Sequence, residues 1–214
     1  MSSARSVSKG GKPASPFKSQ AEKAAERAAK RDAVLRAAVR MFNERGFTAT
    51  SLDDVATSLR ITKRTIYHYL KSKDQVLLEC LKIGLRQLLD AAHEARNLPG
   101  TGRERLARFL RRYAEINMED FGRCVIRTGE EVLARESLAE YRALKREIDQ
   151  AMRGLIEEAI ADGSIAPQDV KLTAFALAGA LNWPARWHDP NGSMPADRIA
   201  SALVDVLMNG LIPR

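Results

Sequence analysis

Long apolar runs are absent from this 214-residue sequence, and no stretch of 18 or more consecutive apolar residues occurs. A membrane-spanning helix is therefore not expected. The first thirty residues are polar and basic and hold no apolar segment like that of a secretory signal, so we expect a cytoplasmic protein. The only two cysteines, Cys80 and Cys124, lack a C-x-x-C context. We expect a buried, reduced and inert pair, with a redox switch as the less favoured alternative.

The signatures of common enzyme and metal sites are also missing. The sequence has no G-x-S-x-G and no H-E-x-x-H motif, and Gly10-Gly11-Lys12 lacks the spacing of a phosphate-binding loop. The three histidines, at positions 68, 93 and 188, are scattered and lack the spacing of metal ligands. We therefore predict a protein that is not an enzyme and that needs no metal or cofactor.

Positive charge is present in excess, but it is confined to one part of the chain. The formal net charge is +8 at pH 7. Residues 1–72 hold 15 Lys or Arg against 6 Asp or Glu, whereas the remaining residues hold 20 against 21. This asymmetry indicates that the N-terminal third meets a polyanion. Nucleic acid and an anionic membrane surface are both compatible with it.

The spacing of apolar residues is that of helices, and alternating β-branched patterns are missing, so the predicted fold class is all-α. Residues 1–20 hold six serines and few large apolar side chains, and we place a disordered basic arm at 1–25. Pro184 should bend the helix that contains it. The longer helices are expected at residues 26–45, 73–96, 103–118, 137–161, 167–187 and 195–209, with an irregular piece at 121–127.

Two short helices joined by a tight turn are expected between the first two long ones. Ser51 with Asp54 forms a capping-box pair for the first, and Thr62 can cap the second, which should run to about Leu70. In a helix-turn-helix the second helix enters the major groove by its N-terminal end. The residues there offer charge, hydroxyls and an imidazole to bases and phosphates: Lys63, Arg64, Thr65, Tyr67 and His68. The alternative is an ordinary helical hairpin with a solvated basic face.

These residues carry a resemblance to a known family. Gly46-Phe47-Thr48-Ala49-Thr50-Ser51, Val55-Ala56 and the segment from Ile61 to Lys73 closely resemble the DNA-binding signature of the TetR family of bacterial repressors. The likeness covers about residues 30–80. Two positions depart from the family pattern. Arg60 stands where the turn usually has glycine, which strains the backbone if a positive φ is needed, and Leu70 replaces the usual phenylalanine.

The resemblance implies a helix-turn-helix DNA-binding domain at residues 26–72 and an all-helical ligand-binding and dimerisation domain at 73–214. It implies a homodimeric repressor that leaves a palindromic operator when a small effector binds among the middle helices. By position, Thr50, Ser51 and Lys73 would contact phosphate. The apolar stripes at 174–181 and 199–210, on the last two long helices, would form the dimer interface.

A second resemblance concerns the C-terminal part. Residues 180–187, Ala-Leu-Asn-Trp-Pro-Ala-Arg-Trp, look like a TetR subgroup that senses acyl-CoA thioesters. This implies an acyl-CoA or related lipid as effector. The candidate ligand-binding residues are Arg186, Trp183 and Trp187, with Phe109 and Phe121 from the middle helices. Alternatively, the tryptophans pack at the dimer interface and Arg186 only extends to solvent.

Five arginines, at positions 103, 105, 108, 111 and 112, cluster on the helix expected at 103–118. They are either a solvated helix face or a site for an anion such as a CoA phosphate.

A helical protein that binds a membrane surface through its basic third is the alternative function. Such a helix would carry large Trp, Phe or Leu side chains opposite its Lys and Arg residues. Residues 18–31 are mostly Ala, Lys, Arg and Glu, so they lack that face. We therefore favour operator DNA and a small-molecule effector as partners.

Overall fold

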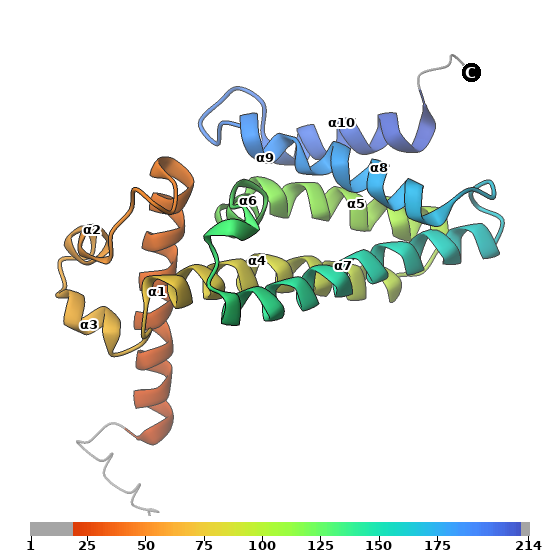
Figure 1. The fold of residues 1–214 in the computed structure, drawn as a ribbon. Helices are drawn as coiled ribbons and strands as arrows, with labels where there is room; N and C mark the ends of the chain where they lie inside the picture. The colour runs from red at the N-terminus through yellow and green to blue at the C-terminus, as the bar shows by residue number, and fades with distance from the viewer. Residues whose placement is uncertain (1–18, 211–214) are drawn as a thin grey trace, which may run out of the picture.

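The computed structural model describes residues 19–210, and this part of the chain forms ten α-helices and one short 3-10 helix, without a strand. The predicted all-α class is confirmed. Figure 1 shows a three-helix head at one end of an elongated helical body. The elements are α1 (Gln20–Arg45), α2 (Leu52–Ser58), α3 (Lys63–Tyr67), α4 (Lys73–Arg96), α5 (Gly102–Met118), α6 (Asp120–Arg127), η1 (Glu130–Val132), α7 (Arg135–Ala161), α8 (Val170–Asn182), α9 (Pro184–Trp187) and α10 (Ala196–Asn209).

The first helix starts earlier than the sequence pattern predicted. Ser19 caps α1, because its hydroxyl accepts the amide of Glu22 while the Glu22 carboxylate accepts the amide of Ser19. This capping box precedes an alanine-rich stretch of high helix propensity. Residues 20–25 are therefore helical, and the expected disordered arm at 1–25 is wrong for these six residues. The rest of that arm, residues 1–18, lies outside the described residues.

The head is held together by a small apolar core. Val39 of α1, Val55 of α2 and Ile66 of α3 are all fully buried. α3 is shorter than expected, since it ends at Tyr67, but Leu70 beyond it is still buried in the core. The short helix α3 is thus fixed on its inner side by Ile66 and, just beyond its end, by Leu70.

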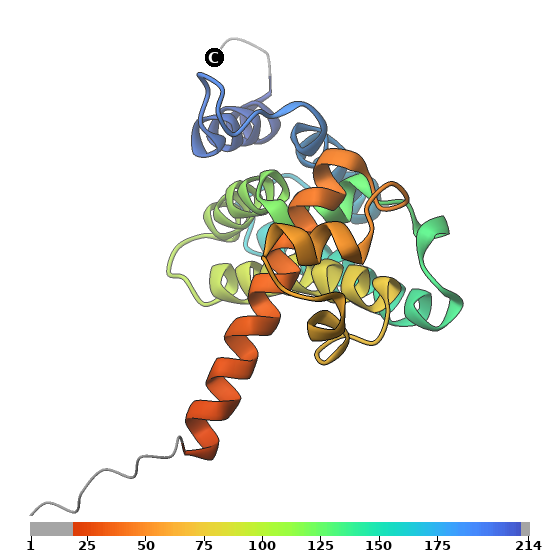
Figure 2. The same ribbon diagram turned by 90° about the vertical axis from the view of Figure 1, so that its left-hand side faces the viewer.

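The body is arranged in layers around α4. This long helix packs against α5, α6 and α7, while α8 and α10 cover α5 on the other side. Figure 2 shows the molecule from the head end, with α8 to α10 above the remaining helices. Among residues 19–210, no helix combines the length and the apolar character needed to cross a membrane.

Two expected boundaries in the body differ in detail. The segment expected to be irregular at 121–127 is a regular helix, α6. The helix expected at 167–187 is split after Asn182, and Pro184 occupies the first turn of α9. Proline lacks an amide hydrogen and cannot continue the preceding hydrogen-bond pattern, so the helix is interrupted at this position.

The turn between α2 and α3 contains Arg60 at the position where the family usually has glycine, and this residue does adopt a positive φ. Arg60 has a φ of 54°, and it is the one non-glycine residue with a positive φ within residues 19–210. Its side chain is exposed, so the protein accommodates the conformation without packing around the guanidinium.

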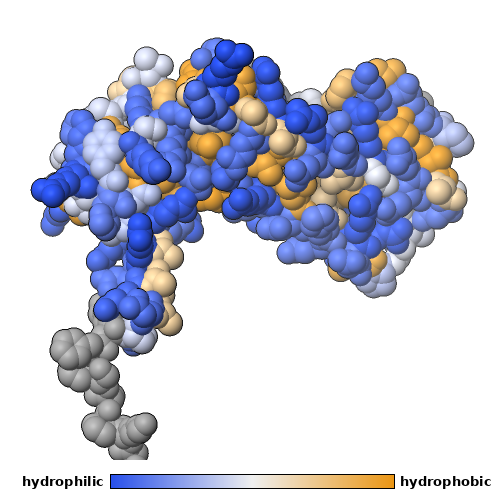
Figure 3. Space-filling model, turned by 60° about the horizontal axis from the view of Figure 1, so that its bottom comes forward, coloured by the Kyte–Doolittle hydropathy of each residue, from blue (hydrophilic) through white to orange (hydrophobic). Residues whose placement is uncertain are grey.

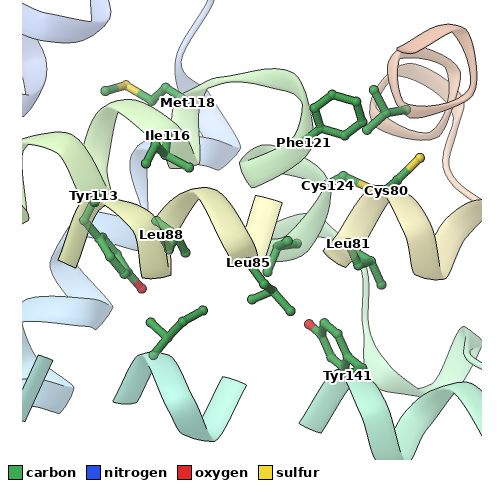
Figure 4. Close-up of a cluster of buried hydrophobic side chains, with 14 of the residues drawn as sticks. Cys80, Leu81, Leu85, Leu88, Tyr113, Ile116, Met118, Phe121, Cys124 and Tyr141 are labelled. Atoms are coloured by element: carbon green, nitrogen blue, oxygen red, sulfur yellow. The ribbon is translucent and has the colours of Figure 1, made fainter. Parts of the chain in front are cut away.

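The two cysteines lie in the apolar core, on α4 and α6 (Figure 4). Both are free thiols. Burial raises the pKa of Cys124 to about 11 and holds the pKa of Cys80 well above its ordinary value. The thiolate needed for redox chemistry is therefore disfavoured at neutral pH, in agreement with the expected inert pair.

Candidate DNA-binding surface, effector cavity and dimer face

The recognition helix α3 presents its polar side chains outward. Arg64 and His68 are exposed, and the Tyr67 side chain is 46% exposed although it is large and aromatic. Thr65 is held nearer the helix start, where its amide donates to the Thr62 hydroxyl. An exposed aromatic beside basic residues suits contact with base edges and thymine methyl groups.

Lys63 stands at the first position of α3 and forms an ion pair with Asp53 of α2 at 2.6 Å. The hydrogen bond to Asp53 and its charge raise the pKa of Lys63. Both side chains are exposed, so the pair contributes little to stability and exchanges easily for a phosphate.

The side chain of Thr50, for which the motif implies a phosphate contact, is buried. The residue is 1% exposed, and its hydroxyl donates to the carbonyl oxygen of Gly46 at 2.9 Å and lies 3.2 Å from that of Met41. In this conformation the hydroxyl is therefore turned inward, although Thr50 lines the hollow beside α2 and α3. Thr50 fixes the loop between α1 and α2, a buried role that the sequence motif does not distinguish from a surface one.

Ser51 and Lys73 border a shallow hollow of about 290 Å3 with Lys63 and Tyr67. The Ser51 hydroxyl caps α2 through the amide of Asp54. The Lys73 ammonium lies 4.2 Å from the centre of the Phe47 ring, and partial burial lowers its pKa. The starts of α2, α3 and α4 thus converge on one hollow that carries two lysines.

A separate cavity of about 570 Å3 lies in the body. It is bounded by α4, α5, α6, α7 and α8, by the segment that joins α6 to η1, and by Arg186 of α9. Its apolar wall is formed by Leu85, Leu88, Val125, Ile126, Ile148, Met152, Ala174 and Ala178. Its size and largely apolar wall are those of a small-molecule site.

Two tyrosines bring hydroxyls to this cavity. Tyr113 donates to the side-chain oxygen of Asn182 at 2.9 Å, and Asn182 also accepts from Asn117. Burial raises the pKa of Tyr113 and of Tyr141 to about 12, so both remain neutral phenols. Figure 4 shows both hydroxyls directed toward the side of α4 that carries Leu85 and Leu88. Neutral phenols can give or accept hydrogen bonds inside an otherwise apolar space.

Charged residues stand among the other lining residues. Lys145 pairs with Glu130 at 3.1 Å, and Glu130 is also held by Arg142 at 2.7 Å. Both partners lower the pKa of Glu130, which therefore stays ionised. Arg186 lies at the cavity with a guanidinium nitrogen 3.4 Å from the carbonyl oxygen of Ile126.

Of the five predicted ligand-binding residues, the structure brings Arg186 and Trp183 to the cavity. Phe109 and Phe121 are buried in the core and do not line it. Trp187 is 49% exposed and does not line it either. The lining residues that the sequence did not reveal include Tyr113, Tyr141, Lys145 and Asn182. They come from three helices, and no spacing within one helix signals their convergence.

The five arginines of α5 do not line this cavity, and Arg103, Arg108 and Arg111 instead line a separate surface hollow of about 610 Å3 beside α10. Arg111 pairs with Asp205 of α10 at 3.0 Å, and Arg112 pairs with Glu119 at 2.8 Å. These contacts favour a structural and solvated face over a phosphate site for an effector in the body.

A large apolar face is exposed on α8 and α10, but its register differs from the prediction. Leu172 and Phe175 of α8, Trp183 directly after α8, and Val206 of α10 are exposed. The stripe expected at the dimer interface, Ala174, Leu177 and Leu181, is instead buried inside the protomer, as is Ile199. Three of the four residues of the stripe predicted on α8 therefore pack within the protomer, whereas Val206 of the stripe predicted on α10 is exposed.

Comparison with known proteins agrees with this architecture. The family described as "Bacterial regulatory proteins, tetR family" matches residues 34–80, and "Tetracyclin repressor-like, C-terminal domain" matches residues 99–211. Because these matches include more than half of the chain, the protein belongs to the TetR family of transcriptional regulators. It is a DNA-binding regulator of the repressor type.

Individual relatives extend along most of the chain. The HTH-type transcriptional repressor KstR2 of Mycolicibacterium smegmatis is 26% identical over 188 residues, which are 86% of this chain and 91% of the relative. The crystal structure of PfmR from Thermus thermophilus is similar with a TM-score of 0.77 and 30% identity, over 84% of this chain and 99% of that one. AibR, solved with isovaleryl coenzyme A and operator DNA, has the same fold with a TM-score of 0.72 and 24% identity, over 84% of this chain and 98% of that one. These relatives are regulators rather than enzymes.

Proposed function

We propose that this chain is an effector-controlled repressor. As a homodimer it binds a palindromic operator, and it leaves the DNA when an amphipathic ligand of the acyl-CoA class occupies the body. The observation that carries the proposal is that one protomer holds both an exposed basic recognition surface and a separate cavity of about 570 Å3, with α6 between them.

The DNA-binding part rests on α3 and the hollow beside it. Arg64, Tyr67 and His68 face outward for base and groove contacts, while Ser51 and Lys73 border the hollow of about 290 Å3. A phosphate there would meet the amides at the starts of two helices as well as lysine charge.

The homodimer is inferred from the exposed apolar face of α8 and α10. Leu172, Phe175, Trp183 and Val206 form an apolar surface that a second copy would cover about a two-fold axis. Because a two-fold dimer presents two identical heads, its operator is expected to be a palindrome.

The proposed class of ligand is inferred from the residues that line the cavity. Its apolar wall suits an acyl chain, and the Tyr141 phenol can bind a carbonyl oxygen within it. Arg186 and Lys145 can meet negative charge at the edge, so the phosphates of CoA would lie outside while the acyl part lies inside. The structure of AibR, a protein of the same fold, holds isovaleryl coenzyme A, and this supports the same class of ligand here.

Release from DNA would be a shift between two conformations. An effector that binds more tightly to the conformation with mismatched head spacing lowers operator affinity by the same coupling factor. No covalent step is needed.

The test is a titration of the operator complex with acyl-CoAs of several chain lengths. Dissociation is measured by the fluorescence anisotropy of a labelled DNA fragment from the region upstream of the gene that encodes this protein. We expect acyl-CoAs of a limited length range to dissociate the complex, and free CoA to leave it intact. Arg186→Ala should raise the effector concentration required without changing operator affinity. Tyr67→Ala should weaken operator binding by about 1–3 kcal/mol.

Matched controls are Arg146→Ala and His93→Ala, which remove exposed side chains of the body. If no acyl-CoA dissociates the complex while a cationic or aromatic compound does, the ligand class is wrong and the repressor assignment stands. Operator binding that is unchanged in Tyr67→Ala would refute the assignment of α3 as the recognition helix.

A further inference from the structure

The first turns of α1 project from the head with no other helix packed on them (Figures 1 and 2). Every residue from 20 to 30 is exposed except Glu26, which is half-buried, and the buried residues of α1 begin only at Val34. We name residues 20–30 the α1 extension. The extension carries only alanines and polar or charged residues and is not packed into the core, so its side chains are available to a partner outside the protomer.

Local interactions keep the α1 extension helical. The Ser19–Glu22 capping box closes its start, and Lys30 pairs with Glu26 at 2.6 Å. Such caps and i,i+4 pairs stabilise an isolated helical end by a few tenths of a kcal/mol to about 1 kcal/mol each. The extension therefore presents its side chains in a fixed arrangement.

Basic residues of the α1 extension form a row. Lys23, Arg27 and Lys30 follow one another at spacings of four and three, which places them on one side of the helix. Together with Glu26 they border a hollow of about 250 Å3 whose other wall is His68 and Tyr69. The row thus begins beside the end of the recognition helix and leads away from it.

The direction of the α1 extension is set by the fold. Figure 1 shows α8 and α10 on the upper side of the body and the α1 extension pointing to the lower side. Figure 3, which brings the lower side forward, shows it standing clear of the head, with hydrophilic residues along one side and a strip of weakly apolar residues along the other. If a second copy covers α8 and α10, the extension points away from the two-fold axis. It would then lie outside the half-site that α3 reads.

We propose that the α1 extension binds the phosphate backbone of the duplex that flanks each half-site, outside the palindrome. The eleven residues span about 16 Å, which is about five nucleotide steps of one strand. Three cationic side chains on one side of a helix match a row of phosphates, and the absence of large apolar side chains from the extension disfavours a membrane. This inference rests on the proposed function. The added contact requires that duplex DNA extend beyond the half-site, but it does not depend on the base sequence of that flanking DNA.

The experiment compares two labelled duplexes, one trimmed to the palindrome and one with flanks of a full helical turn of unrelated sequence. The wild-type chain should bind the flanked duplex more tightly. The triple variant Lys23→Gln, Arg27→Gln, Lys30→Gln should lose this difference and keep its affinity for the trimmed duplex. Its slope of log affinity against log salt on the flanked duplex should fall by about one for each phosphate that the variant no longer neutralises.

The matched control neutralises three exposed arginines of the body, Arg86→Gln, Arg135→Gln and Arg146→Gln, with the same change in net charge. It should preserve the preference for the flanked duplex. Glutamine keeps high helix propensity, and circular dichroism verifies that the extension remains folded. A triple variant that retains the flank preference overturns the proposal, and so does equal weakening on both duplexes. Failure of the wild-type chain to bind either duplex is a different result, which refutes the proposed function itself.

Discussion

At the scale of single residues, the turn between α2 and α3 stores strain in one backbone conformation. Arg60 has a φ of 54°, a region in which a Cβ atom crowds the following carbonyl oxygen at a cost of about 1–2 kcal/mol. Glycine avoids this crowding, but it also gains entropy in the unfolded chain. The exposed arginine is therefore retained at some cost to the stability of the head.

Arg60→Gly should accordingly raise the free energy of unfolding by about 0.5–1 kcal/mol, measured as an increase in the urea midpoint with an unchanged slope. Arg60→Ala is the control, because it removes the guanidinium and keeps the Cβ atom. It should leave the stability close to that of the wild-type chain. Equal midpoints for the glycine and alanine variants would show that the positive φ carries no strain.

At the scale of helices, α8 is apolar on two sides, and only one of them meets its own core. Leu177 is 6% exposed, whereas Phe175, two residues earlier, is 54% exposed. A 3–4 spacing identifies an apolar stripe, but it does not say whether the stripe packs within the protomer or against a second copy. The fold decides this through the packing of α8 against α5 and α7.

Phe175→Arg and Val206→Arg should therefore give folded monomers that no longer bind the operator, because a charge placed in an apolar interface loses its solvation. Leu177→Arg should instead destabilise the protomer itself by about 3 kcal/mol or more. Sedimentation and thermal melting separate the two outcomes. Leu98→Arg, at an exposed leucine between α4 and α5, is the control and should remain a dimer. An intact dimer in both interface variants would move the interface elsewhere.

The helices and the recognition motif could be predicted from the sequence, because they depend on local signals. The Ser51 and Thr62 caps mark the starts of α2 and α3, and Pro184 marks the break after α8. The cavity could not be predicted, because its lining depends on which sides of distant helices meet. Phe109 resembles a ligand-binding aromatic in sequence, yet it packs in the core with its ring edge-on to Tyr113.

At the scale of the whole molecule, α6 is one of two helices, with α4, that both line the cavity and pack against α1 of the head. Val125 and Ile126 near its end line the cavity. At its start, Asp120 accepts a hydrogen bond from Asn43 through its carbonyl oxygen at 2.8 Å and pairs with Arg40 at 3.2 Å. Both partners belong to α1, so under the proposed function a displacement of α6 by an effector would reach the DNA-binding head through these contacts.

Asn43→Ala should weaken this connection without touching either binding site. We expect operator affinity and effector affinity to stay near the wild-type values when each is measured alone. The factor by which the effector lowers operator affinity should fall by the equivalent of about 0.5–2 kcal/mol, because reciprocal coupling needs a contact that distinguishes the two conformations. Anisotropy titrations of operator at zero and saturating effector measure this factor.

Asn97→Ala is the control, because it removes a comparable side-chain hydrogen bond to a backbone carbonyl at the end of α4. It should leave the coupling factor unchanged. Equal coupling in both variants would show that the signal leaves the cavity by a route other than the start of α6.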